Sequence, residues 1–475
     1  MWPWLKRMLG APAAPVAVGR TAMPAAARPR MATAPPAPGA AAPRPQTPAA
    51  VAPPPAGAPL VTADVAAAVA DAAESMPGFG PRRPLVGRQG QVAGFELRLA
   101  PAAERFLASR GDTPGAAAHH AGLLSTAAGL TATGRAALLR MPAVMLARPG
   151  VANGVGAGMW LLVDDLAAVP ADTAAALRGR GALLGVADGP PMATPPSDFV
   201  VVQAGAGGVD TLMLSAQRWR ELLPRVAIVG LGFEHVEDME AALRGAVTLA
   251  GGQLGRSRDA PPPKPLGAAA HRICELLNHL AMDRETSVVA EAVRGDATLT
   301  YRLLRYANSP AVGAKQGVEA VDTAVALLGR RELRRWLSVQ LMLSAGSARQ
   351  AAKALEEGAL VRGRVLENIA RKLCEPNPGA HFTLGLLSVI EPLLQVPLKD
   401  AIAPLRLGDE ANAALLRGEG PWAGRLRLLD ALDAGETGQA EALAGELGLP
   451  EGGLTGIVDD AWGWSAQMRG DESAA

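Results

Sequence analysis

Cysteine and tyrosine are scarce in this 475-residue sequence, which has two of each. Cys274 and Cys374 stand far apart in apolar segments, which excludes a disulfide framework and favours two small buried side chains. This cysteine usage indicates an intracellular, cytoplasmic protein. The six histidines lack the spacing of metal ligands. The sequence therefore predicts no metal site and no cofactor.

Excess charge and long apolar runs are also missing. The formal net charge is +1 and charged residues make up 19% of the chain, which excludes a protein whose main role is to bind nucleic acid. No apolar run reaches the roughly 18 residues that a membrane span requires. We therefore predict no transmembrane segment.

Acidic residues are absent before Asp64, where Ala and Pro dominate in phrases such as APRPQTPAAVAPPPAGAP. A segment of this composition cannot bury enough apolar surface to offset the entropy of the chain. Residues 1–78 are predicted to be a disordered region, and residues 466–475 a flexible C-terminus.

Residues 79–257 contain short apolar segments that alternate with Ala-rich helical ones. The first two strands, residues 84–86 and 92–99, flank a turn at residues 88–90. MWLLVDDL, ALLGVA, FVVVQAG and RVAIVGLG follow as strands, and VEDMEAALRGAVTLAG as a helix. This alternation predicts an α/β domain of parallel β/α units, in which functional groups lie at the carboxyl ends of the strands.

The opening phrase RRPLVGRQGQVAGFELRLA, with Glu96 in GFEL, resembles the start of an EAL domain, the barrel that hydrolyses cyclic di-GMP. RVAIVGLGFEHVEDMEAALRGAVTLAGGQLGR resembles its closing stretch. The resemblance maps three carboxylates onto EAL-type positions, namely Glu96, Asp188 and Glu234. Other ligand positions hold Ala187, Val201 and Leu231. It therefore implies a degenerate barrel without a catalytic ring, whose remaining acids are solvated strand ends, structural hydrogen bonds or parts of a residual ligand pocket.

Residues 258–465 read almost entirely as helices after the linker RDAPPPKP. DATLTYRLLRYANSP, capped by Asp296 or Thr298, precedes VEAVDTAVALLGRRELRRWLSVQLML, in which two helices are expected to meet at Gly329. These phrases resemble the core of an HDOD domain, an all-helical relative of the HD phosphohydrolases. Where an HD enzyme has its His-Asp pair, this chain has Ser388 and Val389, which implies that no catalytic metal binds there.

The helix DATLTYRLLRYANSP contains both tyrosines of the chain. We interpret it as a joint, in which Tyr301 and Tyr306 each supply a ring and one hydrogen bond and Asn308 stops the helix. An interaction surface for an acidic partner, a phosphate or the barrel is equally compatible with its arginines, as is a solvated face. The candidate surface consists of Arg302, Arg305, Tyr306, Asn308, Arg330, Arg331, Arg334, Arg335 and Trp336.

The sequence thus predicts a non-catalytic bacterial signal-transduction protein that contacts other signalling proteins in a cyclic di-GMP related network. The first alternative is an effector that binds cyclic di-GMP without turnover. The second is an active phosphodiesterase with unrecognised ligands.

Overall fold

The computed structural model describes residues 78–189, 197–205, 207–308, 312, 317–344 and 349–467. The predicted disordered region 1–78 lies outside these residues apart from Gly78, and so do residues 468–475. The last described helix ends at Gln467, two residues beyond the predicted end of the helical region. No helix in the described ranges is long and apolar enough to cross a membrane.

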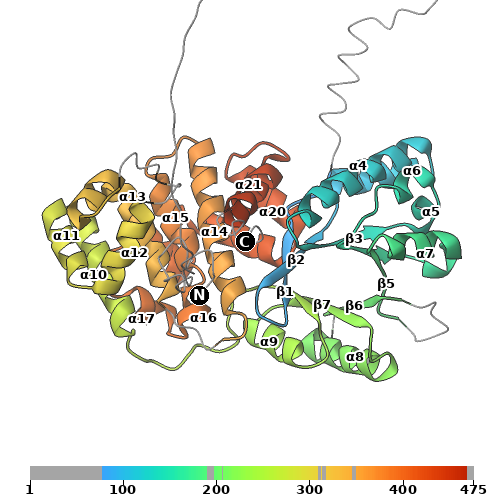
Figure 1. Ribbon diagram of the computed structural model, residues 1–475, viewed down its shortest axis with the longest axis horizontal. Helices are drawn as coiled ribbons and strands as arrows, with labels where there is room; N and C mark the ends of the chain where they lie inside the picture. Colours follow the sequence, from blue (N-terminus) through green and yellow to red (C-terminus); the bar gives the residue numbers. More distant parts are fainter. Residues whose placement is uncertain are drawn as a thin grey trace, which may run out of the picture. The chain divides into compact units, whose positions relative to one another are not determined.

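A closed eight-stranded barrel opens the described chain (Figure 1). The first strand, β1 (Arg83–Gly87), is antiparallel to both of its neighbours, β2 (Val92–Leu97) and β8 (Leu249–Gly252). The parallel strands between them are β3 (Ala136–Met141), β4 (Met159–Val163), β5 (Leu183–Ala187), β6 (Phe199–Gln203) and β7 (Ala227–Phe233). Parallel strands are covered on both faces, and the apolar runs MWLLV and FVVVQ fit that position.

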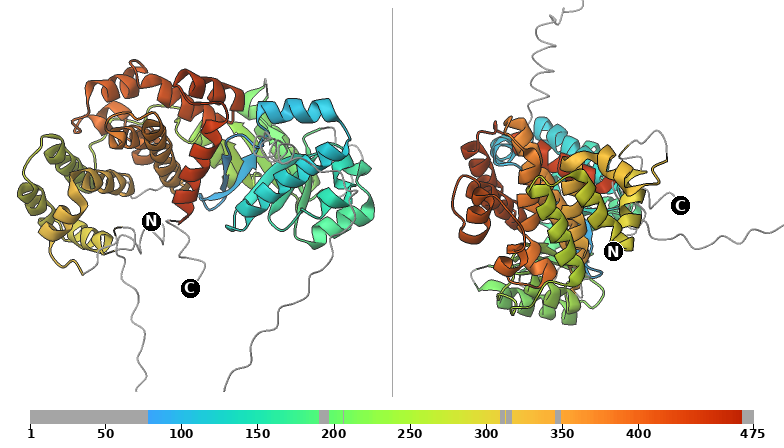
Figure 2. Two further views of the ribbon diagram at one scale, coloured as in Figure 1. Left: turned by 90° about the horizontal axis from the view of Figure 1, so that it is seen from above. Right: turned by 90° about the vertical axis from the view of Figure 1, so that its left-hand side faces the viewer.

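The barrel helices follow the strands along the chain and pack on the outer face (Figures 1 and 2). They are α3 (Pro101–Arg110), α4 (Pro114–Thr131), α5 (Ala143–Leu146), α6 (Pro149–Ala152), α7 (Ala171–Gly179), α8 (Gly208–Leu222) and α9 (Val236–Arg244). The barrel interior is filled by alternate strand residues, including Leu85, Leu138, Val201 and Leu231. The predicted α/β barrel is therefore confirmed. Two strands were not anticipated, because β3 was not recognised and β8 was assigned to a helix.

Twelve helices are described after the barrel, and they form the all-α region. They are α10 (Ala268–Ala281), α11 (Thr286–Arg294), α12 (Ala297–Ala307), α13 (Val321–Leu343), α14 (Ala352–Lys372), α15 (Pro378–Leu387), α16 (Ile390–Leu394), α17 (Leu398–Ile402), α18 (Asp409–Arg417), α19 (Ala423–Ala434), α20 (Thr437–Glu446) and α21 (Gly453–Gln467). The carboxylate of Asp296 caps α12, accepting from the amides of Thr298 and Leu299. Gly329 interrupts α13 with φ 66° and ψ 169°, which confirms the predicted change of direction.

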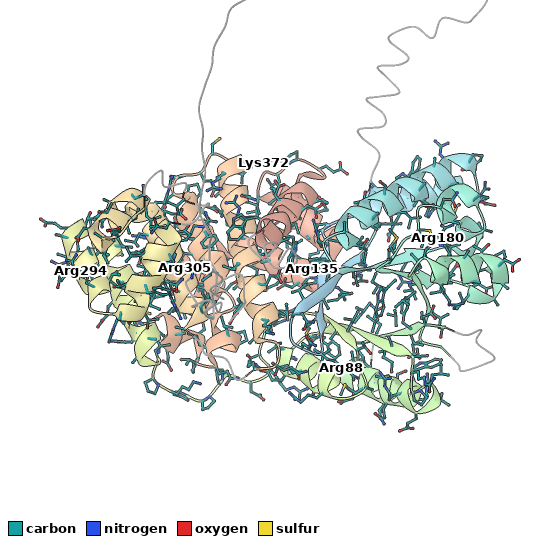
Figure 3. All side chains as sticks on the ribbon, in the orientation of Figure 1. Arg88, Arg135, Arg180, Arg294, Arg305 and Lys372 are labelled. Carbon is teal, nitrogen blue, oxygen red and sulfur yellow. The ribbon has the colours of Figure 1, made fainter. Side chains whose placement is uncertain are left out.

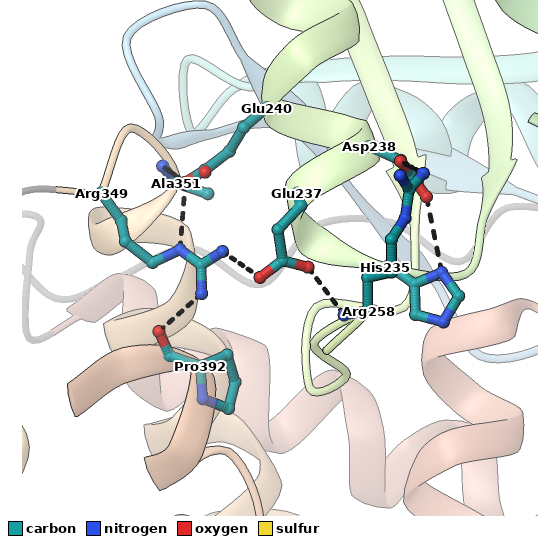
Figure 4. A network of polar contacts seen from close by, with 8 residues as sticks. All are labelled: His235, Glu237, Asp238, Glu240, Arg258, Arg349, Ala351 and Pro392. Carbon is teal, nitrogen blue, oxygen red and sulfur yellow. Dashed lines mark hydrogen bonds and ion pairs between the residues drawn. The ribbon is translucent and has the colours of Figure 1, made fainter. Parts of the chain in front are cut away.

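Polar contacts join the barrel helix α9 to the segment before α14 (Figure 4). Arg349 donates to the carboxylate of Glu237 and, at 3.0 Å, to the carbonyl of Pro392. The amide of Ala351 donates to Glu240 at 2.9 Å. Burial is the largest single effect on Glu237 and opposes its ionisation. The hydrogen bonds from Arg349 and from the Arg258 amide, together with the Arg349 charge, outweigh burial and hold the pKa of Glu237 below its usual value.

The two cysteines differ in exposure. Cys274 is buried as predicted, but Cys374 is exposed. The prediction was wrong for Cys374, which follows the end of α14 and has a positive φ of 54°. Burial, with a smaller contribution from Glu275, raises the pKa of the Cys274 thiol to about 11.

We expect iodoacetamide at pH 8 to alkylate Cys374 in the folded protein and to spare Cys274. Only about one Cys274 side chain in a thousand is a thiolate at that pH, and the thiolate is the nucleophile. Peptide mapping by mass spectrometry measures both sites, with urea-unfolded protein as the control in which both react. Equal labelling of the two cysteines before unfolding would contradict the prediction.

Candidate functional site

The carboxyl ends of the parallel strands are the first candidate site, because barrel chemistry is located at this end. Glu96 pairs in register with Arg83 and Leu138. Residues paired in this way have side chains on the same face of a sheet. Since Leu138 belongs to the interior cluster, Glu96 and Arg83 point into the barrel near its carboxyl end.

Glu96 and Arg83 form a buried ion pair, in which a guanidinium nitrogen of Arg83 donates to the carboxylate of Glu96. Only 8% of Glu96 and 3% of Arg83 are exposed. The other terminal nitrogen of Arg83 donates to the carbonyl of Ala434 at 2.8 Å. The carboxylate that the sequence marked as an EAL-type position is therefore neutralised by a neighbouring strand.

The turn between α19 and α20 packs against this end of the barrel. Arg98 donates to the carbonyl of Gly435 at 2.8 Å. Gly435 has a φ of 73°, and a Cβ atom on it would lie 3.0 Å from the Arg83 side chain. Glycine suits this position, because it adopts the left-handed conformation and leaves room for the guanidinium. The turn thus covers the Arg83–Glu96 pair.

The other two EAL-type acids have different surroundings. Asp188 follows β5 and accepts hydrogen bonds from Ser215 at 2.5 Å, Arg218 at 2.8 Å and the indole nitrogen of Trp219 at 2.7 Å. Glu234 follows β7 and is exposed. These hydrogen bonds give Asp188 a structural role in holding α8. The structure does not bring the Asp188 carboxylate next to Glu96.

The strand ends supply little else that can bind a cation. Val201 and Leu231 belong to the interior cluster, and Ala187 pairs in register with Val201. Within the described ranges, no group of three or more His, Cys, Asp or Glu residues is placed to hold a metal ion. This donor set, which includes the cation of Arg83, does not fit the pair of divalent ions that the EAL resemblance implies.

Sequence reasoning missed Arg83, although a signal was present. It lies two residues before Leu85 on a strand, and alternation places both side chains on one face. An arginine next to the signature glutamate on the interior face would have indicated the ion pair.

The position of the HD metal pair is the second candidate site. Arg362 on α14 donates from Nε to Ser388 at 2.8 Å. Its terminal nitrogens donate to Asp433 at 2.6 Å and Asp430 at 2.9 Å. Val389 is 1% exposed and packed in the core. A guanidinium and its two carboxylates thus occupy the surroundings of Ser388 and Val389.

The helix α12 is the third candidate. Tyr306 is buried, and its hydroxyl donates to Glu332 at 2.5 Å. Burial, aided by this hydrogen bond, raises the pKa of Tyr306 far above its usual value. The side-chain nitrogen of Asn308 donates to the carbonyls of Leu304 and Val318, and its oxygen accepts from the Val318 amide. These contacts fit the interpretation of a joint, whereas Tyr301 is exposed.

The arginines of the candidate surface have separate surroundings. Arg302 donates to Gln340, Arg305 (Figure 3) donates to Tyr301, and Arg330 forms an ion pair with Asp283. Arg335 forms an ion pair with Glu367 and lies over the rings of Phe382 and Trp464. Arg331 is exposed and Arg334 lines a cavity. The structure corrects two members of the set, since Tyr306 and Trp336 are buried and stacked on each other.

Comparisons with known proteins agree with this architecture. A family model described as HDOD domain matches residues 265–403. The uncharacterized protein YuxH of Bacillus subtilis is 27% identical over 179 residues, which cover 37% of this chain and 44% of YuxH. The cyclic di-GMP phosphodiesterase CdgJ of Vibrio cholerae is 25% identical over 182 residues, covering 38% and 42%. The chain thus spans less than half the length of these curated relatives.

The chain is also similar to solved structures. A PaMucR phosphodiesterase in complex with c-di-GMP has a TM-score of 0.31 and 14% identity, covering 37% of this chain and 93% of that one. The FimX EAL domain of Pseudomonas aeruginosa bound to c-di-GMP has a TM-score of 0.31 and 12% identity, covering 39% and 93%. Residues 265–403 thus match the HDOD domain model, and they follow a closed eight-stranded barrel that is similar to solved EAL domains.

Proposed function

We propose that this chain is a catalytically silent signal-transduction protein that acts through protein contacts in a cyclic di-GMP related network. The observation that carries the proposal is the ion pair of Glu96 with Arg83 beneath the α19–α20 turn. A carboxylate that is already neutralised by a buried guanidinium is a poor ligand for a divalent cation.

The hydrolysis of cyclic di-GMP determines which metal ligands an active site would need. Metal-assisted cleavage of a phosphodiester needs several oxygen ligands to hold two cations and activate a water molecule. Asp188 is held by α8, and the neighbouring interior positions are apolar. The HDOD region is also unsuited to a catalytic metal ion. Arg362 donates to Ser388, and this fixed positive charge opposes the binding of a cation there.

The proposal is tested with the purified full-length chain and cyclic di-GMP in the presence of Mg²⁺ or Mn²⁺, and without either ion. Isothermal titration calorimetry measures binding, and chromatography measures the linear dinucleotide. We expect no linear product above the protein-free blank and no binding heat. Arg83→Gln frees Glu96 from its ion pair but is expected to stay inactive, because the apolar interior positions remain. Arg82→Gln on the adjacent residue is its control.

Two outcomes overturn the proposal. Turnover that is lost in Glu96→Gln would identify a phosphodiesterase with a ligand set that the structure does not display. Binding without turnover would instead identify a cyclic di-GMP effector, with the nucleotide as its input.

A further inference from the structure

The HDOD region contains a cavity of about 210 Å³ that has no role in the proposed function. It lies among α10, α13, α15 and α18, with Trp422 at the start of α19. Most of its wall is apolar, and Leu341, Leu384 and Leu387 are almost fully buried. Concave, mostly apolar sites with a few polar groups are typical of small-molecule binding.

Three neutral polar side chains on the wall already have partners. Asn278 donates to the carbonyl of Pro404 and accepts from the Arg406 amide at 2.7 Å. Thr383 donates to the carbonyl of Gly379 at 3.1 Å, and Ser338 donates to that of Arg334 at 2.9 Å. These groups shape the cavity and hold its walls together.

Arg334 is different, because its guanidinium has neither a hydrogen-bond acceptor nor an ion-pair partner in the described part of the chain. The next arginines on α13 do have carboxylates, since Arg330 pairs with Asp283 and Arg335 with Glu367. Arg334 is half-buried, and its pKa is lowered, mainly by burial and less by the nearby Arg330, while the charge of the exposed Asp283 opposes this shift. A partly desolvated cation without a directly bonded acceptor favours an anion beside it.

The rim of the cavity adds positive potential. Arg406 lines it with an exposed side chain that has no partner among the described residues. Gly408, the residue before α18, also lines the cavity and cannot cap the helix with a side chain. The exposed acids Asp409 and Glu410 follow it, but the cavity wall does not include them.

We propose that this cavity binds a small organic anion, with its carboxylate at Arg334 and a short apolar body between the leucines. The planar guanidinium matches a carboxylate in a two-bond arrangement. An apolar cavity of about 150 Å³ is known to accept a benzene ring, so the volume here suits a body of that size or a short acyl chain.

Calorimetric titration of the full-length chain with sodium octanoate tests the proposal. We expect one octanoate to bind per chain, and 1-octanol and inorganic phosphate to bind at least about tenfold more weakly, since each lacks one half of the recognised chemistry. Arg334→Met should weaken octanoate about tenfold or more through loss of a charge-assisted hydrogen bond. Ala411→Phe, which fills the cavity, should abolish binding.

The matched control is Arg331→Met, which removes an exposed arginine of α13 outside the cavity wall and should bind octanoate like the wild type. Circular dichroism monitors the folding of each variant. Should Arg334→Met not fold, the preference of the wild type for octanoate over 1-octanol decides the same question. Absence of octanoate binding, equal affinity for 1-octanol, or undiminished affinity of a folded Arg334→Met variant would each overturn the proposal.

Discussion

Replacing Arg135 by Met is expected to lower the free energy of unfolding by about 3–5 kcal/mol, the cost of leaving a buried charge without its partner. Arg135 (Figure 3) precedes β3 and donates to Glu357 on α14. The side chains are 3% and 0% exposed, respectively. Ser465 donates to the same carboxylate at 3.0 Å. One neutral hydrogen bond stabilises the carboxylate too weakly to replace the lost cation.

Urea denaturation followed by circular dichroism and by tryptophan fluorescence measures this effect. Arg148→Met is the matched control, because the Arg148–Asp112 pair is partly exposed, at 33% and 56% of the two side chains, and should contribute less than about 1 kcal/mol. Adding Glu357→Leu to Arg135→Met should restore much of the stability, since the carboxylate is then gone as well. A loss below about 1 kcal/mol in Arg135→Met would show that the pair does not hold the barrel to the helices.

The second large effect is expected for Arg362→Met, at about 3 kcal/mol or more. Arg362 is 5% exposed and its three donor groups bind Ser388, Asp430 and Asp433. Burial raises the pKa of Asp433, and the Arg362 cation opposes that rise. Without the guanidinium, Asp433 loses the interaction that keeps its ionised form stable.

The same urea experiment measures the stability of Arg362→Met. Arg371→Met on the same helix is the control, because Arg371 is 49% exposed and its partner Glu367 keeps its ion pairs with Arg335 and Arg364. The loss in this variant should stay below about 1 kcal/mol. If both variants lost the same small amount of unfolding free energy, the contacts of Arg362 with Ser388, Asp430 and Asp433 would be a surface network and not a buried joint.

Local patterns were sufficient to predict much of the fold. The β1–β2 hairpin, the Asp296 cap and the turn at Gly329 each depend on a few adjacent residues, so the sequence displays them directly. β3 and β8 were harder, because short strands among Ala-rich helical segments lack a distinct period. Their identity follows from closure of the barrel, in which β8 pairs with β1.

The candidate site depended on contacts that no local pattern reveals. The sequence identified Glu96 but not the partner that neutralises it, and the Arg135–Glu357 pair joins residues 222 positions apart. Burial of Trp336 and exposure of Cys374 likewise follow from tertiary packing. Charge pattern alone cannot distinguish an exposed arginine from one that lines a cavity, as Arg331 and Arg334 show.

The turn over the barrel also has a consequence for synthesis of the chain. Arg83 leaves the ribosome 351 positions before Ala434, the carbonyl to which it donates. At about 5–20 residues per second this interval lasts roughly 20–70 s. During translation the nascent barrel therefore remains without this cover until the residues of the α19–α20 turn have been made.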